Sequence, residues 1–213
     1  MTSVCLHYIY DPLCGWCYGA SPLVRAAREV PGLSIALHGG GLMVGAGRRQ
    51  VSEDLRRFVL HHDQRIAELS GQPFGEAYRE GLMRDATVTL DSEPPTAGIL
   101  TAEALARRGL DMLARIQTAH YVEGRRVTEQ AVLAELALEI GLDPDHFASE
   151  LSRTLAGPVR EHIAQSRRLL EQVAGEGFPT FVLETDGRAE KLDLMRWYGR
   201  VEPWRAELTQ RAA

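Results

Sequence analysis

The sequence predicts an α/β protein in which a βαβ unit and a ββα unit are separated by a large all-helical insertion. Between residues 52 and 174, apolar side chains recur at the spacing of amphipathic helices. We therefore expect one domain from residues 1–45 and 175–213, and a helical insertion domain from residues 46–174. Strand-like stretches occur only near the two ends of the 213-residue chain, at residues 4–10, 33–37, 181–183 and 189–192.

The first unit opens with a stretch that is typical of a central strand. Residues 4–10 are apolar at nearly every position and stop at Asp11 and Pro12, as expected for a strand covered on both faces. A helix over residues 15–29 follows, and Pro31-Gly32 turns the chain into a second short strand. This order predicts a βαβ unit with a right-handed crossover.

Five to seven helices are expected in the insertion. Ser52 is a good N-cap for the first of them, Thr128 precedes another, and Pro158 suits the first position of a third. Pro94-Pro95, Gly109 and Pro144 indicate breaks between helices. One apolar face of the first helix carries Leu55, Phe58, Val59, His62, Ile66 and Leu69.

The last unit is predicted to be a hairpin followed by a helix. Residues 181–183 form its first strand, and Asp186-Gly187 supplies the positive φ angles that a two-residue turn needs. A second strand over residues 189–192 and an amphipathic helix over residues 202–211 complete the chain. Trp197 and Trp204 are expected to pack in this unit.

Composition and charge exclude several classes of function. The chain is 45% hydrophobic and 25% charged, with a net charge of -5 and no run of five like charges. This pattern offers no electrostatic footprint for nucleic acid or for an anionic membrane. No stretch approaches the ~20 apolar residues of a membrane span, and the N-terminus lacks the features of a signal peptide. We therefore expect a cytoplasmic protein.

Cys14 and Cys17 stand three residues apart where the first strand ends and a helix begins. The positive end of a helix favours the thiolate form of Cys14, and Cys17 lies one turn later on the same face. Gly15 would let a substrate backbone approach, and Trp16 would form an apolar lip beside the sulfur. The pair is therefore interpreted as a catalytic dithiol in which Cys14 attacks and Cys17 resolves the mixed disulfide.

A structural zinc site and an inert pair of core residues are the two other interpretations of this pair. A structural zinc site needs a second pair of ligands, and the remaining cysteine, Cys5, lies in the first strand as an expected core residue. An inert pair of core residues is the other alternative. The position directly after a buried strand favours catalysis over both, and no metal is expected.

Cys14-Gly15-Trp16-Cys17 resembles the active-site motif of the thioredoxin superfamily, and the helical insertion resembles its DsbA-like branch, especially the cytoplasmic, FrnE-like members. Pro22 matches the proline of the active-site helix in that family. Phe178-Pro179-Thr180 resembles the cis-proline loop. The resemblance implies a thioredoxin fold, thiol–disulfide oxidoreductase activity, and a loop at residues 178–180 that holds the substrate or glutathione against the sulfurs.

Two residues depart from the family pattern. The buried acid that relatives carry six residues before the first cysteine is Tyr8 here, so the usual proton acceptor for the second thiol is missing. Asp11 is the nearest acid and a candidate replacement, although a turn residue before Pro12 is the slightly favoured interpretation. Strongly oxidising members carry histidine beside the first cysteine where this chain has Gly-Trp, so a strongly oxidising potential is not expected.

A second group with a similar outline comprises the 2-hydroxychromene-2-carboxylate isomerases and the kappa-class glutathione transferases. Those enzymes generally carry serine in place of the first cysteine, so Cys14 and Cys17 together favour exchange over a glutathione-dependent isomerase or transferase. The expected partners are protein or small-molecule disulfides and thiols. No cofactor is expected beyond the dithiol, with glutathione as a possible co-substrate.

We interpret three further stretches as structural. Residues 39–47 are rich in glycine but lack the Gly-Lys-Ser/Thr of a phosphate loop, so we interpret them as a flexible connector whose Leu42 and Met43 could contact an apolar substrate. His61, His62 and Asp63 are adjacent on a helix and point in different directions, which argues against one metal site. Residues 120–125 resemble the helix-to-helix corner of DsbA-like insertions.

Overall fold

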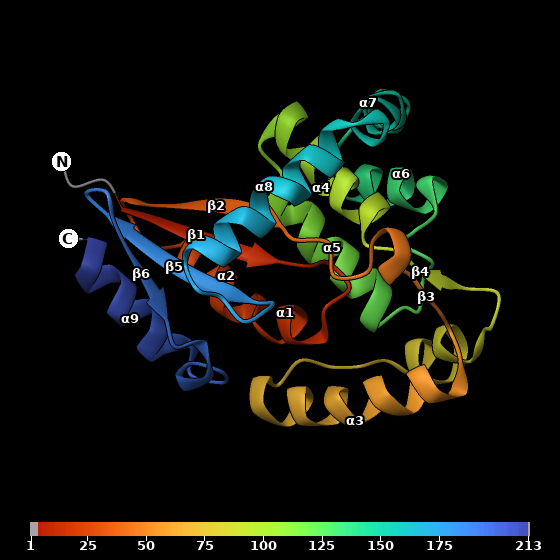
Figure 1. Cartoon of the computed structure of the whole chain (residues 1–213), viewed down its shortest axis with the longest axis horizontal. Coiled ribbons are helices and arrows are strands. Elements are labelled where there is room, and N and C mark those ends of the chain that lie inside the picture. The colour runs from red at the N-terminus through yellow and green to blue at the C-terminus, as the bar shows by residue number, and fades with distance from the viewer. Residues whose placement is uncertain (1–3, 213) are drawn as a thin grey trace.

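The computed structural model describes residues 4–212 and contains a four-stranded sheet in the order β2-β1-β5-β6. The first strand, β1 (Val4–Tyr10), runs parallel to β2 (Leu33–Gly39) and antiparallel to β5 (Thr180–Thr185). The last strand, β6 (Arg188–Leu192), pairs with β5. Figure 1 shows this sheet at one end of the molecule and most of the helical insertion at the other. The predicted βαβ and ββα units are therefore confirmed.

β1 is a central strand, as predicted, and most of its side chains are buried. Tyr8 and Phe181 lie opposite each other on β1 and β5, and their rings pack edge to face at 4.9 Å. Cys5 differs from its expected place in the core because it is half-buried. It alternates with the buried positions of the strand, on the side where His7 is also half-buried.

The helix expected over residues 15–29 is divided into α1 (Gly15–Gly19) and α2 (Ser21–Arg28). Pro22 lies in the first turn of α2 and has no N–H with which to continue the hydrogen bonds of α1. Ala20 joins the two helices and has an αR backbone.

Six α-helices of the described chain fall in the insertion, within the predicted range of five to seven. Pro94-Pro95, Pro144 and Pro158 each lie in the first turn of a helix, so they stand at breaks between helices, as predicted. Proline is tolerated there because a first-turn N–H has no intrahelical partner to lose. Asp143 caps the helix that begins at Pro144, because its side chain accepts from the N–H of His146. The six helices are α3 (Glu53–Ser70), α4 (Glu93–Ala106), α5 (Gly109–Tyr121), α6 (Gln130–Glu139), α7 (Pro144–Ala156) and α8 (Pro158–Gln172).

Short elements in the insertion were not predicted. A two-stranded sheet pairs β3 (Arg49–Gln50) with β4 (Thr89–Leu90), antiparallel. A π-helical turn, Ala77–Gly81, lies between α3 and α4. Two-residue strands and single turns carry too few residues to produce a recognisable period, which is why the sequence does not reveal them.

The predicted apolar face of α3 is only partly buried. Ile66 is buried, whereas Phe58 is 64% exposed. Ser52 caps this helix as predicted, by accepting from the N–H of Leu55. Figure 1 shows α3 along one side of the molecule, next to α1. Its face borders a pocket rather than a closed core.

The C-terminal unit follows the sequence closely. Asp186 and Gly187 have φ angles of 50° and 79° and form the two-residue turn between β5 and β6. The last helix, α9 (Val201–Ala212), packs on α2, and the indole N–H of Trp204 donates to the carbonyl of Leu23 at 2.9 Å. Trp197 is also buried, as expected.

Residues 4–212 contain no helix that is both long enough and apolar enough to span a membrane. The division into a domain of residues 1–45 and 175–213 and an insertion domain of residues 46–174 stays a prediction.

Candidate active site

Cys14 and Cys17 are both free thiols at the start of α1, but they differ in accessibility. Cys14 is the N-cap residue and is 7% exposed, whereas Cys17 is 0% exposed. The N–H of Asp11 donates to Sγ of Cys17 at 3.4 Å. Burial, followed by a hydrogen bond with the Cys14 thiol, raises the pKa of Cys17 well above its usual value. Cys17 is therefore held protonated behind Cys14.

The Phe178-Pro179-Thr180 loop lies against Cys14. The Cys14 thiol donates to the carbonyl oxygen of Phe178 at 3.4 Å, and the Phe178–Pro179 peptide bond is cis. The hydroxyl of Thr180 donates to the carbonyl of Gly177 at 2.8 Å. The expectation of a cis proline facing the dithiol is confirmed. The roles of these residues in catalysis and binding remain predictions.

Gly40 and Arg167 hold the segment beside this loop. A Cβ on Gly40 would lie 2.1 Å from the ring of Phe178, so only glycine fits beneath the ring. The guanidinium of Arg167 donates to the carbonyls of Gly40 and Gly41, with Nε 2.8 Å from the Gly40 oxygen. The expectation that residues 39–47 form a flexible connector is therefore wrong for Gly39, Gly40 and Gly41, which are buried and closely packed.

Asp11 is fully buried and organises the turn before Cys14. Its Oδ1 accepts from the N–H of Leu13 at 2.8 Å, and its Oδ2 accepts from the N–H of Leu42 at 2.5 Å. Burial raises the pKa of Asp11, and these two hydrogen bonds oppose the rise. Both carboxyl oxygens accept hydrogen bonds from backbone N–H groups of the loops, which agrees with the favoured interpretation of Asp11 as a turn residue. Its use as a proton acceptor for Cys17 stays a prediction.

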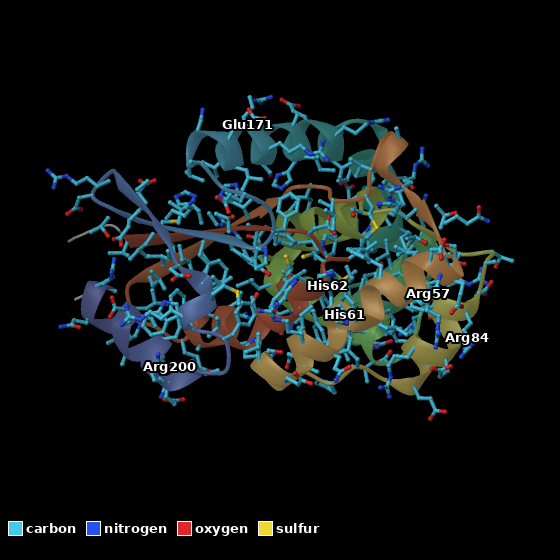
Figure 2. The ribbon with its side chains drawn as sticks, turned by 60° about the horizontal axis from the view of Figure 1, so that its bottom comes forward. Arg57, His61, His62, Arg84, Glu171 and Arg200 are labelled. Atoms are coloured by element: carbon cyan, nitrogen blue, oxygen red, sulfur yellow. The ribbon has the colours of Figure 1, made fainter. Side chains whose placement is uncertain are left out.

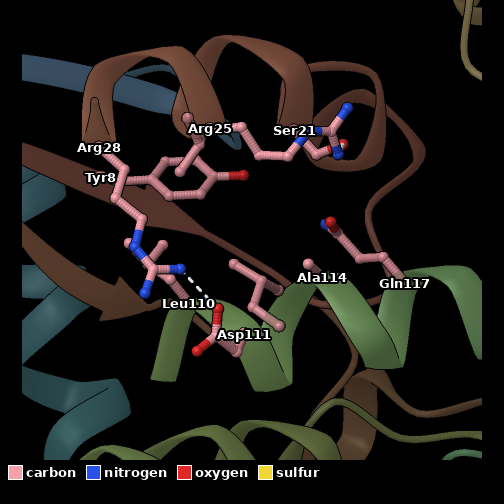
Figure 3. Close-up of a pocket in the computed structure, with 10 residues that line it drawn as sticks. Tyr8, Ser21, Arg25, Arg28, Leu110, Asp111, Ala114 and Gln117 are labelled. Carbon is pink, nitrogen blue, oxygen red and sulfur yellow. Dashed lines mark hydrogen bonds and ion pairs between the residues drawn. The ribbon is translucent and has the colours of Figure 1, made fainter. Parts of the chain in front are cut away.

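Tyr8 occupies the position of the expected buried acid, below Cys17. Its hydroxyl donates to the carbonyl of Cys17 at 3.2 Å, and burial raises the pKa of Tyr8 well above its usual value. A small cavity of ≈ 100 Å³ opens beside this ring, and neither Cys14 nor Cys17 lines it. Figure 3 shows the Tyr8 hydroxyl and the Gln117 amide there, with the ion pair of Arg28 and Asp111 at one end.

A larger pocket of ≈ 370 Å³ has Cys14 in its wall and leaves Cys17 outside. Leu42 and Met43 line it, so part of the segment at residues 39–47 does border the groove. The pocket is mainly apolar and two of its aliphatic and aromatic side chains, Leu42 and Phe58, are exposed at its rim. Cys14 is thus the one thiol of the pair that a ligand in this pocket can meet.

Trp16 separates this pocket from a second hollow of ≈ 540 Å³. The hydroxyl of Tyr198 donates to the carbonyl of Trp16 at 2.7 Å, and the two rings pack edge to face at 5.5 Å. The guanidinium of Arg65 lies 6.0 Å from the Trp16 ring. Phe178, Pro179 and Thr180 line the second hollow. Trp16 therefore forms an apolar wall shared by both hollows.

Sequence reasoning did not assign polar residues to the far wall of the pocket around Cys14. Asp63 and Tyr78 lie there, joined by a hydrogen bond of 3.0 Å, with His120 and Tyr121 beside them. His120 and Tyr121 belong to the stretch interpreted as a structural corner, so that interpretation was incomplete. The only signal in the sequence is the His61-His62-Asp63 cluster. The directions of its histidines argue against a metal site, and they give no information about the role of Asp63.

His61 and His62 do not converge on one site. Figure 2 shows them at neighbouring positions of α3, where His61 is exposed and His62 lies in the pocket wall. No group of three or more histidine, cysteine or acidic side chains within residues 4–212 is arranged to hold a metal ion.

Comparison with known proteins supports the same fold. The profile of the DsbA-like thioredoxin domain matches residues 6–201. The cytosolic disulfide reductase DsbM from Pseudomonas aeruginosa is 54% identical, with a TM-score of 0.92 and coverage of 97% of this chain and 98% of that one. A second structure of that protein, with GSH, gives a TM-score of 0.91 at 52% identity over the same shares of the two chains.

A more distant structure shares the fold alone. A 2-hydroxychromene-2-carboxylate isomerase is 16% identical, with a TM-score of 0.62 and coverage of 97% of each chain. No curated protein matches the sequence.

Proposed function

Because this chain belongs to the DsbA-like thioredoxin domain family and is a thiol–disulfide oxidoreductase, we propose that it acts as a disulfide reductase in the cytoplasm, with Cys14 as the attacking thiol and Cys17 as the resolving thiol. The observation that carries this assignment of roles is the difference in access between the two sulfurs. Cys14 lines the pocket and contacts the carbonyl of Phe178, whereas Cys17 is fully buried.

The proposed reaction has two steps. The Cys14 thiolate attacks one sulfur of the substrate disulfide, the S–S bond breaks, and one half leaves as a thiolate that takes up a proton. Cys17 then loses its proton and attacks Sγ of Cys14, which releases the second half and forms a disulfide between Cys14 and Cys17. Two electrons pass from the protein to the substrate.

Reduction is the direction that the site favours. The raised pKa of Cys17 keeps its thiol protonated until a mixed disulfide forms. Gly15 and Trp16 put no cation between the cysteines to stabilise a thiolate on the reduced protein, which is the device of strongly oxidising relatives. The 54% identical relative is named as a cytosolic disulfide reductase, which supports both the direction and the compartment.

Glutathione and apolar disulfides are the proposed substrates. The carbonyl oxygen of Phe178 lies 3.4 Å from Sγ of Cys14, so a peptide backbone bound along the loop at residues 178–180 would lie beside the sulfur. The related reductase has a solved structure with GSH, which supports glutathione as the co-substrate. Phe58 and Leu42 offer apolar contact at the rim. We propose no metal, no further cofactor, and no nucleic-acid or membrane partner.

A redox titration tests this proposal. The protein is equilibrated in glutathione buffers of graded potential, quenched with an alkylating reagent and measured by mass. A reversible loss of two alkylated thiols that map to Cys14 and Cys17 is expected, and Cys5→Ser, which changes the remaining cysteine, should titrate identically. Two thiols that stay separate at every potential would refute the proposed function.

A further inference from the structure

Asp63 is a buried carboxyl group in the wall of the pocket that contains Cys14. It lies on α3, its residue is 5% exposed, and it faces the start of α1. Its Oδ1 would be 2.9 Å from a Cβ placed on Gly15, the residue after Cys14. A glycine at position 15 therefore leaves the space through which this carboxyl approaches the active-site turn.

The two oxygens of Asp63 have different surroundings. Oδ2 accepts from the hydroxyl of Tyr78 at 3.0 Å. Oδ1 accepts no hydrogen bond from residues 4–212. It is not fully enclosed, and Asp63 lines the pocket, so this oxygen is accessible from the pocket. A buried carboxyl with one oxygen fixed and the other open can exchange a proton with a ligand in the pocket.

The groups around Asp63 leave it close to a balance between its two protonation states. Burial raises its pKa to about 7, and the hydrogen bond from Tyr78 opposes this rise. Burial lowers the pKa of His120 to about 3, so that imidazole is neutral and brings no positive charge. The titratable and charged groups that line the same pocket are Cys14, Arg49, His62, Tyr78, His120 and Tyr121.

We propose that Asp63 is a further catalytic residue, which donates the proton taken up by the leaving thiolate when Cys14 opens a substrate disulfide. This inference rests on the proposed function. As the Cys14 thiolate forms a bond to one substrate sulfur, the electron pair of the broken S–S bond stays on the other sulfur. That sulfur takes the proton from Oδ1 of Asp63, so the products are a mixed disulfide on Cys14, a free thiol and the Asp63 carboxylate.

The choice of leaving group tests this proposal in single turnovers of the reduced protein. Bis(2-hydroxyethyl) disulfide releases a basic alkyl thiolate, which needs an acid, whereas 2,2′-dithiodipyridine releases a weakly basic one, which does not. Asp63→Asn should slow the reaction with the alkyl disulfide roughly 100-fold. Its rate of reaction with the pyridyl disulfide should stay within about twofold of the rate of the unchanged protein. The matched control is Asp54→Asn, an exposed acid on the same helix.

Both reactions depend in the same way on the ionisation of Cys14. This dependence therefore cancels in the ratio of the rate with the alkyl disulfide to the rate with the pyridyl disulfide. In the unchanged protein this ratio should fall as the pH rises through about 7, and it should be flat in Asp63→Asn. Tyr78→Phe removes the hydrogen bond that stabilises the carboxylate, so the fall should move to higher pH. This variant keeps the ring and its packing.

The possible outcomes separate the two proposals. Equal losses with both disulfides in Asp63→Asn, or a ratio that does not vary with pH in the unchanged protein, would overturn the role of Asp63 and leave the reductase assignment intact. A reduced protein that reacts with neither disulfide would overturn the reductase assignment itself. A shift in Tyr78→Phe toward lower pH would also contradict the proposed proton donor.

Discussion

Sγ of Cys14 lies 3.4 Å from the carbonyl oxygen of Phe178, although 164 residues separate them in the chain. The contact joins the end of β1 to the start of β5, which are antiparallel neighbours in the sheet. Pairing of these two strands sets the position of both residues, so the distance depends on the register of the sheet. The geometry of the site is thereby tied to the stability of the fold.

Replacing the cysteines one at a time should separate their roles. Cys14→Ser is expected to abolish reduction of insulin disulfides, because the other thiol of the pair, Cys17, is fully buried. Cys17→Ser is expected to accumulate mixed disulfides with substrate, since the resolving thiol is gone. Turbidity measures the reduction of insulin, and mass spectrometry without added reductant detects the mixed disulfides. Equal activity of the two variants would contradict the assigned order of attack.

Gly40→Ala should damage the site through Phe178. The added methyl group would lie 2.1 Å from the ring, so the ring and the carbonyl that contacts Cys14 must shift. We expect a loss of about 1–3 kcal/mol in the free energy of unfolding together with slower disulfide reduction. Urea denaturation and an activity assay give the two values.

Gly81→Ala is the control for this change, because a Cβ there would meet no atom within 4 Å and the φ angle of Gly81 is -100°. If Gly40→Ala lost stability but reduced disulfides at the original rate, the position of the Phe178 ring would have no bearing on the reaction.

Asp63→Asn should stabilise the protein at high pH. The folded-state pKa of about 7 lies above the ordinary value of 3.8, so the folded protein holds this proton more tightly than the unfolded chain does. The stability due to this proton is complete below the unfolded pKa and is lost as the pH rises toward 7. Asp63→Asn has no such loss. Its free energy of unfolding, relative to that of the unchanged protein, should therefore increase by an amount on the order of 4 kcal/mol by pH 8.

Urea midpoints at pH 5 and pH 8 measure this difference. Asp54→Asn, which removes an exposed acid from the same helix, should show no comparable dependence on pH. A constant difference between the Asp63 variant and the unchanged protein at the two pH values would mean that the carboxyl is not protonated in the fold.

His120 should contribute to unfolding in acid. Its folded-state pKa of about 3 lies below the ordinary value of 6.5, because the buried imidazole resists taking a charge. The stability due to neutral His120 is present above pH 6.5 and is lost as the pH falls toward 3, with a slope of up to about 1.4 kcal/mol per pH unit.

His120→Gln should therefore have a flatter stability profile between pH 6.5 and 4 than the unchanged protein. His61→Gln, at an exposed position, is the matched control. Parallel profiles for His120→Gln and the unchanged protein would show that the fold does not lower the pKa of this imidazole.

Local patterns accounted for the parts of the site that are close in sequence. A buried strand, a proline turn and two cysteines three residues apart placed Cys14 and Cys17 at the start of a helix, as the structure has them. The contact with Phe178 followed only from resemblance to a family, because a pattern of neighbouring residues contains no information about a partner 164 positions away.

The far wall of the pocket could not be predicted, and Phe58 illustrates why. Its helical spacing with Ile66 indicated one apolar face, but spacing does not distinguish a face that packs in a core from one that borders a pocket. Asp63, Tyr78 and His120 come from three separate elements. Their meeting depends on how those elements pack, which periodicity does not specify.

The position of β1 in the sheet has a consequence for the nascent chain. Its partner β2 ends at residue 39, so one edge of β1 can be paired early, whereas β5 begins only at residue 180. At about 5–20 residues per second, a ribosome needs on the order of ten seconds to make the stretch between them. Throughout that interval the other edge of β1 has no strand beside it, and Cys14 has no Phe178 to contact. The growing polypeptide is then open both to edge pairing with other chains and to premature oxidation of its active thiol.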